Sequence, residues 1–160
     1  MKSELNVSNY SQLLKKQKLL ETEKKLLNLE DHESYDELIL CNRLALSDAI
    51  FNARKDYIFL TKEYLSEFID PLEFSQRFLA LFYADIYALD IAKMGLAEQN
   101  MEESDKVNLI SNEACDFLVI IKEMLILCLR YNLDVEFNND FVKFYKLIEE
   151  KFQLIKSYVD

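Results

Sequence analysis

The residues most able to do chemistry in this sequence are its single histidine and its carboxylates. His32 lies in an acidic connector, residues 29–33, with carboxylates on both sides. A histidine beside acids can join a metal site, but no second histidine or cysteine is near, and carboxylates alone favour hard cations. Asp85 and Asp90 interrupt the apolar pattern of a predicted helix, yet they are about 140° apart around its axis and cannot act on one substrate atom. We expect an exposed linker histidine, no metal site, and an Asp85 that accepts a hydrogen bond from a buried tyrosine.

The motifs of the common enzyme classes are absent from the sequence. It has no G-x-G-x-x-G, no P-loop, no H-E-x-x-H and no nucleophile elbow, and one histidine cannot supply the Glu-x-x-His pairs of a di-iron bundle. Cys41, Cys115 and Cys128 follow no metal-ligand spacing, and each lies in an apolar run. We expect them to be buried free thiols. The prediction is a protein that is not an enzyme and that has no catalytic residues, cofactor or metal.

A line of acidic residues marks the outer side of a strongly apolar stretch, residues 114–131, which we expect to be the most buried helix. Glu113, Asp116 and Glu123 follow one another at spacings of three and seven residues, so they share one face of that helix. This line is either a solvated helix face or an acidic recognition strip, and the sequence leaves both interpretations open. An exposed tyrosine at the end of the helix would serve as an anchor. The candidate partner-binding residues are Glu113, Asp116, Glu123, Tyr131, Asp134 and Glu136.

The charge of the chain is strongly negative and unevenly placed. Its 160 residues include 29 acidic and 19 basic side chains, for a net charge of −10. Residues 1–60 hold nine Lys and Arg against ten Asp and Glu, whereas residues 61–160 hold ten against nineteen. Nucleic acid and anionic membranes repel such a surface, so neither is an expected partner, and the lysines of residues 15–25 are interpreted as a solvated helix face. The charge suits a basic protein partner, or solubility alone.

The expected location is the cytoplasm, or the plastid stroma if an organelle genome encodes the chain. The N-terminus has no apolar segment typical of a secretory signal. The most hydrophobic run, residues 117–129, contains Lys122 and Glu123 and is too short and too charged to cross a bilayer.

The elements that position these residues are predicted to be helices. One glycine and one proline in the whole chain leave almost no material for hairpins. We expect an all-α fold, an antiparallel bundle of about four to five main helices with an additional N-terminal amphipathic helix. The best-defined stretch is residues 64–94, a helix, a tight corner and a long helix. At the corner, Asp70 suits the cap, Pro71 the first helical position and Glu73 a capping box. The apolar stripe of the long helix is widened by Leu79, Tyr83, Tyr87 and Ile91, so this helix is expected to be central, to pack on two or more neighbours and to end at Gly95.

The N-terminal part is predicted to be a separate region, with residues 1–33 forming an amphipathic helix and an acidic linker and residues 34–160 forming the bundle domain. Residues 1–8 are expected to be frayed. Over residues 9–29, leucines recur every seven positions, a pattern typical of a narrow helical seam. This seam either pairs with a second copy, giving a homodimer, or folds back onto the body of the chain. The leucines are Leu13, Leu20 and Leu27, with a second line at Leu19 and Leu26.

A capping box at residues 34–37 predicts the start of the next helix. No strong breaker separates it from the apolar positions up to residue 69. A single helix over residues 35–69 would be about 50 Å long at 1.5 Å per residue. We therefore expect a break or kink at residues 52–56.

Two further connections are predicted in the C-terminal half. A polar stretch, residues 96–107, is either a loop or a continuation of the long helix, and the next helix begins at Asn108 or Ser111. The following turn ends with Asn138 or Asn139 as the cap of an amphipathic C-terminal helix.

With these helices placed, one pattern resembles a known family. Its residues are Leu60, Tyr64-Leu65 and Phe68-Ile69 before the corner, Glu73-Phe74, Phe78 and Leu81-Phe82 after it, then a very apolar helix and Arg130-Tyr131-Asn132-Leu133-Asp134. Over residues 57–158 the pattern resembles the colicin D-type immunity proteins, the bacterial self-protective colicin-like immunity family. The resemblance implies an acidic helical protein that binds and inhibits a basic tRNA-cleaving toxin domain by presenting acid where the toxin expects RNA phosphate. The alternative is a structural or interaction protein that self-associates through the leucine seam.

Overall fold

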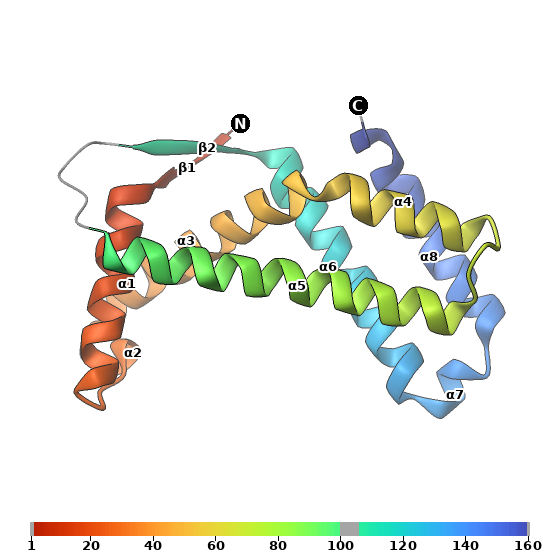
Figure 1. Cartoon of the computed structure of the whole chain (residues 1–160), viewed down its shortest axis with the longest axis horizontal. Helices are drawn as coiled ribbons and strands as arrows, with labels where there is room; N and C mark the ends of the chain where they lie inside the picture. The colour runs from red at the N-terminus through yellow and green to blue at the C-terminus, as the bar shows by residue number, and fades with distance from the viewer. Residues whose placement is uncertain (1, 100–105, 160) are drawn as a thin grey trace. The chain divides into compact units, whose positions relative to one another are not determined.

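The computed structural model describes residues 2–99 and 106–159, and this part of the chain is predominantly α-helical, as expected (Figure 1). Two short strands, β1 Lys2–Asn6 and β2 Val107–Ser111, pair with each other. No helix within the described ranges combines the length and the apolar character needed to cross a membrane. The helices are α1 Val7–Thr22, α2 Leu27–Glu30, α3 His32–Asn52, α4 Arg54–Leu65, α5 Pro71–Glu98, α6 Asn112–Leu133, α7 Val135–Asn138 and α8 Phe141–Ile155, followed by the 3₁₀ helix η1 Lys156–Val159.

The chain forms two compact units, each built from segments that are distant in the sequence. Unit 1 comprises Met1–Asp48 and Tyr87–Cys115, and unit 2 comprises Ala49–Ile86 and Asp116–Asp160. The boundaries fall within α3, α5 and α6, so each of these helices contributes residues to both units. The domain division expected after residue 33 stays a prediction.

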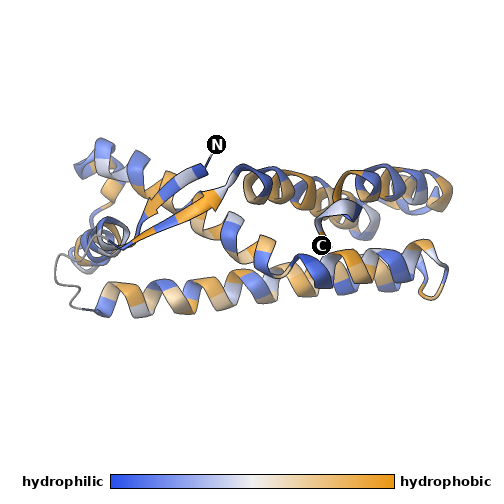
Figure 2. Cartoon of the chain, turned by 90° about the horizontal axis from the view of Figure 1, so that it is seen from above, coloured by the Kyte–Doolittle hydropathy of each residue, from blue (hydrophilic) through white to orange (hydrophobic). Residues whose placement is uncertain are grey.

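In unit 1 the N-terminal residues form a strand, so the expectation that they are frayed was wrong. β1 pairs with β2 in antiparallel register, with Lys2 opposite Ser111. Leu5 and Ile110 are buried, and Figure 2 shows β2 mostly in the hydrophobic colour. The partner strand lies far along the chain, and the strand preference of such short segments depends on the neighbours they meet. Local sequence patterns therefore could not reveal this pairing.

The predicted helix over residues 9–29 is interrupted. α1 ends at Thr22, and Lys24 adopts a left-handed conformation with φ 59°. Leu13 and Leu27 are both buried, but they lie on different helices, α1 and α2. The seven-residue leucine seam is therefore not a stripe on one helix. The large apolar side chains that remain exposed in this region are Leu19, Leu26 and Leu29.

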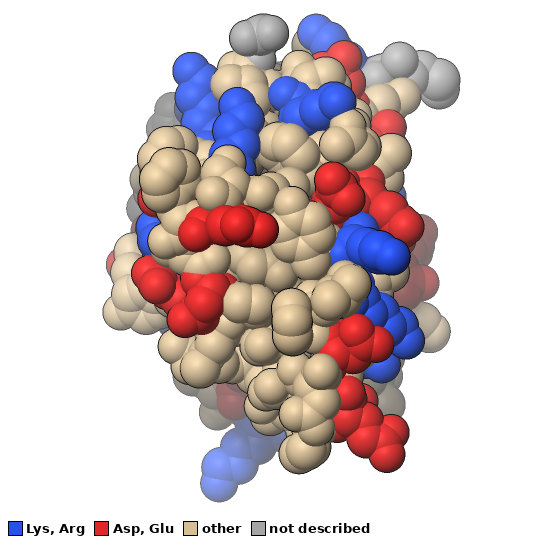
Figure 3. Space-filling model, turned by 90° about the vertical axis from the view of Figure 1, so that its right-hand side faces the viewer, with Lys and Arg blue, Asp and Glu red and all other residues tan. Residues whose placement is uncertain are grey.

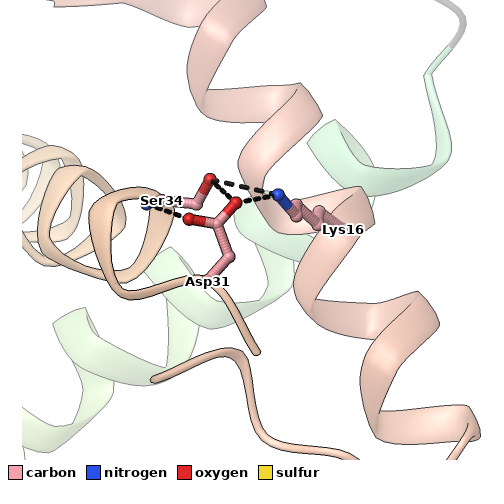
Figure 4. A network of polar contacts seen from close by, with 3 residues as sticks. All are labelled: Lys16, Asp31 and Ser34. Atoms are coloured by element: carbon pink, nitrogen blue, oxygen red, sulfur yellow. Dashed lines mark hydrogen bonds and ion pairs between the residues drawn. The ribbon is translucent and has the colours of Figure 1, made fainter. Parts of the chain in front are cut away.

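A polar network in unit 1 joins α1 to the start of α3 (Figure 4). Asp31 accepts hydrogen bonds from the Ser34 backbone N–H at 3.1 Å and from its hydroxyl at 2.8 Å. The Lys16 ammonium pairs with the Asp31 carboxylate and donates to the Ser34 hydroxyl at 3.2 Å. The Lys16 hydrogen bond, with those from Ser34, holds the pKa of Asp31 well below its usual range. The N-terminus of α3 is thus capped by Asp31 and not by Ser34. The reason is that α3 begins three residues earlier than the capping box at residues 34–37 suggested.

The Asp70 cap and the place of Pro71 at the start of α5 are as predicted, whereas the reciprocal hydrogen bond from the Asp70 N–H to the Glu73 carboxylate, which would complete the capping box, is not among the hydrogen bonds of the described residues. α3 ends at Asn52 and α4 begins at Arg54, which confirms the expected break. Pro71 is the first residue of α5, and the Asp70 carboxylate accepts a hydrogen bond of 2.7 Å from the Glu73 N–H. The Glu73 carboxylate lies 3.6 Å from the Arg77 guanidinium, one turn along the helix. The cap and the fixed φ of proline therefore define where α5 starts.

An aromatic cluster fills the core of unit 2 around Phe144 of α8. The centroid of the Phe144 ring is 4.5 Å from that of Tyr131 and 6.1 Å from that of Phe137. It is also 5.8 Å from the Tyr64 ring and 6.2 Å from the Phe74 ring. Phe144 of α8 thus lies next to one aromatic side chain from each of four helices, which are α4, α5, α6 and α7.

α5 is buried along a narrower face than expected. Phe74, Phe78 and Phe82 are buried, as a core-facing stripe should be. The residues predicted to widen that stripe include Tyr83 and Tyr87, and these two side chains are exposed. Hydrophobic residues recur along the whole of α5 (Figure 2), so periodicity alone overstated how much of the helix is covered. The expected wide stripe was therefore wrong, whereas the expectation that α5 packs on two or more neighbours is confirmed by the contacts of Phe74 with rings of α4 and α8.

The single glycine does not end α5, contrary to prediction. The helix continues through Gly95 to Glu98, and the Gln99 N–H donates to the Gly95 carbonyl at 3.2 Å. A side chain at Gly95 would meet no other atom within 4 Å. Residues 100–105, part of the predicted connection, lie outside the described residues.

Two helices end with a left-handed residue that is not glycine. At the end of α4, Glu67 has φ 61°, its N–H donates to the Tyr64 carbonyl, and the Phe68 N–H donates to the Glu63 carbonyl. Lys24 occupies the equivalent place after α1. This hydrogen-bond pattern is the Schellman motif, in which glycine is the preferred left-handed residue.

Replacing either left-handed residue with glycine should raise stability. Glu67→Gly and Lys24→Gly are each expected to increase the free energy of unfolding by up to about 1 kcal/mol, since glycine adopts this conformation without a Cβ clash. Urea denaturation followed by circular dichroism measures the change. A loss of stability in both variants would contradict the assigned backbone conformation.

The caps of the last two long helices were partly predicted. The Ser111 hydroxyl accepts a hydrogen bond of 3.1 Å from the Ala114 N–H, so Ser111, one of two expected residues, caps α6. The Asp140 carboxylate accepts a hydrogen bond of 3.0 Å from the Lys143 N–H and caps α8. Neither Asn138 nor Asn139 has this role, because the short helix α7 extends the turn.

Candidate functional site

The six predicted partner-binding residues are divided between the two units. Glu113 belongs to unit 1, whereas the other five belong to unit 2. The sequence pattern grouped Glu113 with Asp116 because they are three apart on one helix; both lie on α6, where the boundary between the units falls at Cys115 and Asp116. That these residues form one recognition strip stays a prediction.

Tyr131 is not the exposed anchor that the sequence analysis expected. It is only 7% exposed, and its ring lies against Phe144 in the core of unit 2. Tyr131 follows Cys128 and Met124 at spacings of three and four, and all three residues are buried. This spacing could have indicated from the sequence that Tyr131 is buried, because residues three and four apart share one face of a helix.

Two of the candidate carboxylates are already used within unit 2. Glu123 pairs with the Lys151 ammonium. Asp134 caps α7 by accepting from the Glu136 and Phe137 N–H groups at 3.1 and 3.2 Å, and it also lies 3.9 Å from Arg130.

Other carboxylates of unit 2 are available to a partner. The side chains of Asp116 and Glu136 are exposed, and neither forms an ion pair with any residue in the described ranges. The same holds for Glu149 and Glu150 on α8. These four acidic groups are therefore free to meet cationic groups of another molecule.

Unit 2 has a groove on its surface that sequence reasoning missed. This groove has a volume of about 580 Å³ and lies between the α4–α5 turn and α8. The Tyr145 hydroxyl donates to the Leu65 carbonyl at 3.0 Å and ties α8 to the end of α4. We call this recess the corner groove; its lining residues are Tyr64, Glu67, Phe68, Ile69, Asp70, Pro71, Phe141, Val142, Tyr145, Lys146 and Glu149.

The corner groove combines apolar walls with acidic groups. Phe68 is 82% exposed and Phe141 61% exposed, although both are large aromatic side chains. Three carboxylates and one ammonium belong to the lining. Figure 3 looks onto this end of unit 2, where uncharged side chains fill the middle of the face, acidic side chains lie on both sides of it, and basic side chains lie above it and on the right. Such a surface suits an apolar group that carries positive charge beside it.

Tyr64 forms the buried floor of the corner groove. Its ring stacks on Phe74 with centroids 4.5 Å apart, and the side chain is almost fully buried. Burial raises the pKa of the Tyr64 hydroxyl, which finds no hydrogen-bond partner among the described residues. The lining of the groove thus includes a stacked aromatic ring whose hydroxyl is buried without a hydrogen-bond partner in the described ranges.

The chemistry of the remaining reactive side chains is limited in the described part of the chain. No group of three or more His, Cys, Asp and Glu there could hold a metal ion. His32 is exposed, as expected, but it is the first residue of α3 and not part of a linker. Its Nδ1 lies 3.5 Å from the Asp36 carboxylate, one turn along the helix. Cys41 and Cys128 are buried and burial raises the pKa of each thiol, while Cys115 is half-buried.

The negative charge is shared between the units and is not confined to one. Unit 1 contains 15 Asp and Glu against 9 Lys and Arg, and unit 2 contains 14 against 10. The difference in net charge between residues 1–60 and residues 61–160 therefore has no counterpart in the fold. The reason is that unit 1 combines the nearly balanced N-terminal segment with a later segment that is acidic.

Comparison with models of protein families, with curated proteins and with solved structures finds no match for this chain. The resemblance to the colicin D-type immunity proteins therefore stays a prediction that rests on the sequence pattern, and the function is argued below from the surface of unit 2.

Proposed function

We propose that this chain is a non-catalytic binding protein that engages a basic protein partner through unit 2. The observation that carries the proposal is that unit 2 has exposed carboxylates without an ion pair in the described ranges, among them Asp116, Glu136, Glu149 and Glu150. Following the sequence resemblance, the partner is a tRNA-cleaving toxin domain, and binding inhibits it.

Electrostatics gives this proposal its physical basis. A nuclease that binds tRNA needs a positively charged active site, and a negatively charged protein is attracted toward such a site over distances set by the ionic strength. Complementary charge raises the association rate and favours partners of the right sign more than it adds affinity. The affinity then has to come from buried contacts, which charge alone does not supply.

The test is a tRNA-cleavage assay with purified tRNA-cleaving domains from a panel of colicin D-type toxins. At low salt, the chain is expected to inhibit at least one of them, and the inhibition should weaken as salt rises. The double variant Asp116→Asn with Glu136→Gln should slow association by roughly two- to tenfold, because exposed charges act mainly on the association rate.

The matched control removes the same charge from unit 1. The double variant Glu4→Gln with Glu33→Gln changes two exposed carboxylates there and should leave the association rate within about twofold of the wild-type value. Uninhibited cleavage by every domain at saturating concentrations of the chain would refute the proposal.

Self-association through the N-terminal region is the second candidate function. The exposure of Leu19 and Leu26, next to the turn between α1 and α2, favours it. Deleting residues 1–33 would remove β1 and α1 from unit 1 and disrupt the fold, so point variants are the sharper test. If this candidate is correct, sedimentation should show a dimer that Leu19→Glu with Leu26→Glu converts to a monomer; a monomer in the wild type at high concentration excludes it.

A further inference from the structure

We propose that the corner groove docks a short segment of the basic partner in which an aromatic or leucine side chain lies next to a Lys or Arg. This inference rests on the proposed function and names the contact that would supply its affinity. The groove is the part of unit 2 where apolar walls, negative charge and a rigid frame occur together, and each of these features restricts the occupant.

The size and walls of the groove require an apolar occupant. Its volume of about 580 Å³ falls within the range of about 300–1,000 Å³ that is typical of ligand sites. Phe68, Phe141 and Val142 are at least half exposed around it, so each has apolar surface that a partner side chain could cover. Aromatic side chains provide the largest buried area per residue, which is why they dominate the energetics of interfaces.

The charges at the groove require that the occupant also be basic. Glu67, Asp70 and Glu149 belong to the lining, and Lys146 is its one cation. Asp70 already accepts a hydrogen bond from the α5 N-terminus, so Glu67 and Glu149 are the carboxylates best placed to receive a new cation. A Lys or Arg next to the apolar side chain would meet them, whereas an acidic segment would be repelled.

The frame of the groove is preorganised, which favours tight docking. The Tyr145 hydrogen bond to the Leu65 carbonyl, the stacked Tyr64 ring and the Asp70 cap each fix one part of the wall. A partner therefore need not order these groups when it binds, which lowers the entropic cost of association. Glu67 holds its left-handed conformation where glycine would be more stable, so its carboxylate is kept at this position at a cost to folding.

Two pairs of matched variants test the groove in the complex with an inhibited toxin domain. Val142→Asp places a charge on the apolar wall, and Val119→Asp makes the same change at a valine of unit 2 outside the groove; the two valines are 51% and 56% exposed. Glu149→Lys reverses a charge in the lining, and Glu33→Lys reverses the charge of an exposed glutamate of unit 1, outside the groove.

The expected result is a clear separation within each pair. Val142→Asp and Glu149→Lys should weaken binding about tenfold or more, whereas Val119→Asp and Glu33→Lys should stay within about threefold of the wild type. Thermal unfolding of all four variants shows whether any effect is due to folding. Equal losses within both pairs would show that the partner docks elsewhere on the chain, and would overturn the groove inference while leaving the proposed function intact.

A peptide array separates the groove from the toxin hypothesis. It presents peptides in which Phe or Leu lies beside Lys, and the same peptides with Glu in place of Lys. Wild type should bind the Lys series and not the Glu series, and Val142→Asp should bind neither. Such binding without inhibition of any toxin domain would support the groove and refute the toxin proposal. Absence of binding to the Lys series, or self-association that Val142→Asp abolishes, would overturn the inference.

Discussion

Replacing Phe144 with alanine is expected to lower the free energy of unfolding by about 3–5 kcal/mol, the range for a large aromatic side chain removed from a packed core. Phe144 is fully buried, and its ring lies within 6.2 Å, centroid to centroid, of the rings of Tyr64, Phe74, Tyr131 and Phe137. The substitution leaves a cavity where four elements meet, and those elements cannot all move inward to fill it. Urea denaturation followed by circular dichroism measures the loss.

The control for this variant lies one turn earlier on the same helix. Phe141 is 61% exposed, so Phe141→Ala should change the free energy of unfolding by no more than about 0.5 kcal/mol. Similar losses for the two variants would mean that Phe144 is not the centre of the unit 2 core. Because Phe141 also lines the corner groove, Phe141→Ala is expected to weaken partner binding, whereas Phe144→Ala acts on folding.

The second large effect is expected at the pair formed by the buried Tyr57 and the half-buried Asp85. The Tyr57 side chain is fully buried, and its hydroxyl donates a hydrogen bond of 2.6 Å to the Asp85 carboxylate. Asp85→Ala would leave that hydroxyl without a partner in the core, so we expect a loss of about 1–3 kcal/mol in the free energy of unfolding. A double-mutant cycle with Tyr57→Phe isolates the interaction, and a coupling energy of zero would show that the bond contributes nothing.

The same pair predicts how stability depends on alkaline pH. Burial, and then the hydrogen bond to Asp85, raise the pKa of Tyr57 above its ordinary value of 10.0. The unfolded chain therefore releases this proton near pH 10 while the folded chain retains it. Stability from this group is fully present below that pH and is lost as the pH rises further. Asp85→Asn should make the decline shallower; a steeper decline would contradict the assigned cause.

Local chemistry predicted several features of the fold. The Asp70-Pro71 corner, the break between α3 and α4, and the hydrogen bond from a buried tyrosine to Asp85 were all correctly predicted. At the corner, the groups that cap and start the helix lie within a few residues of one another. The break was predicted from the length that an unbroken helix over residues 35–69 would have. The Asp85 prediction succeeded because a carboxylate in an apolar stripe needs a partner, and tyrosine was the polar residue available.

The features that sequence reasoning missed depend on contacts between distant segments. The β1–β2 pair joins residues 2–6 to residues 107–111. The corner groove joins the α4–α5 turn to α8, so no single segment of the sequence carries its signature. Glu67 was missed for a different reason: the expected signal of a helix end was glycine, and the only glycine, Gly95, lies inside a helix.

The measurement that tests the central claim most directly is the dissociation constant of the purified chain with tRNA-cleaving toxin domains, determined across a series of salt concentrations and in competition with tRNA. If unit 2 presents acid where the toxin binds RNA phosphate, binding should be tightest at low salt, should weaken steadily as salt rises, and should be mutually exclusive with tRNA. No detectable binding to any domain at low salt, or binding that tolerates bound tRNA, would contradict the account.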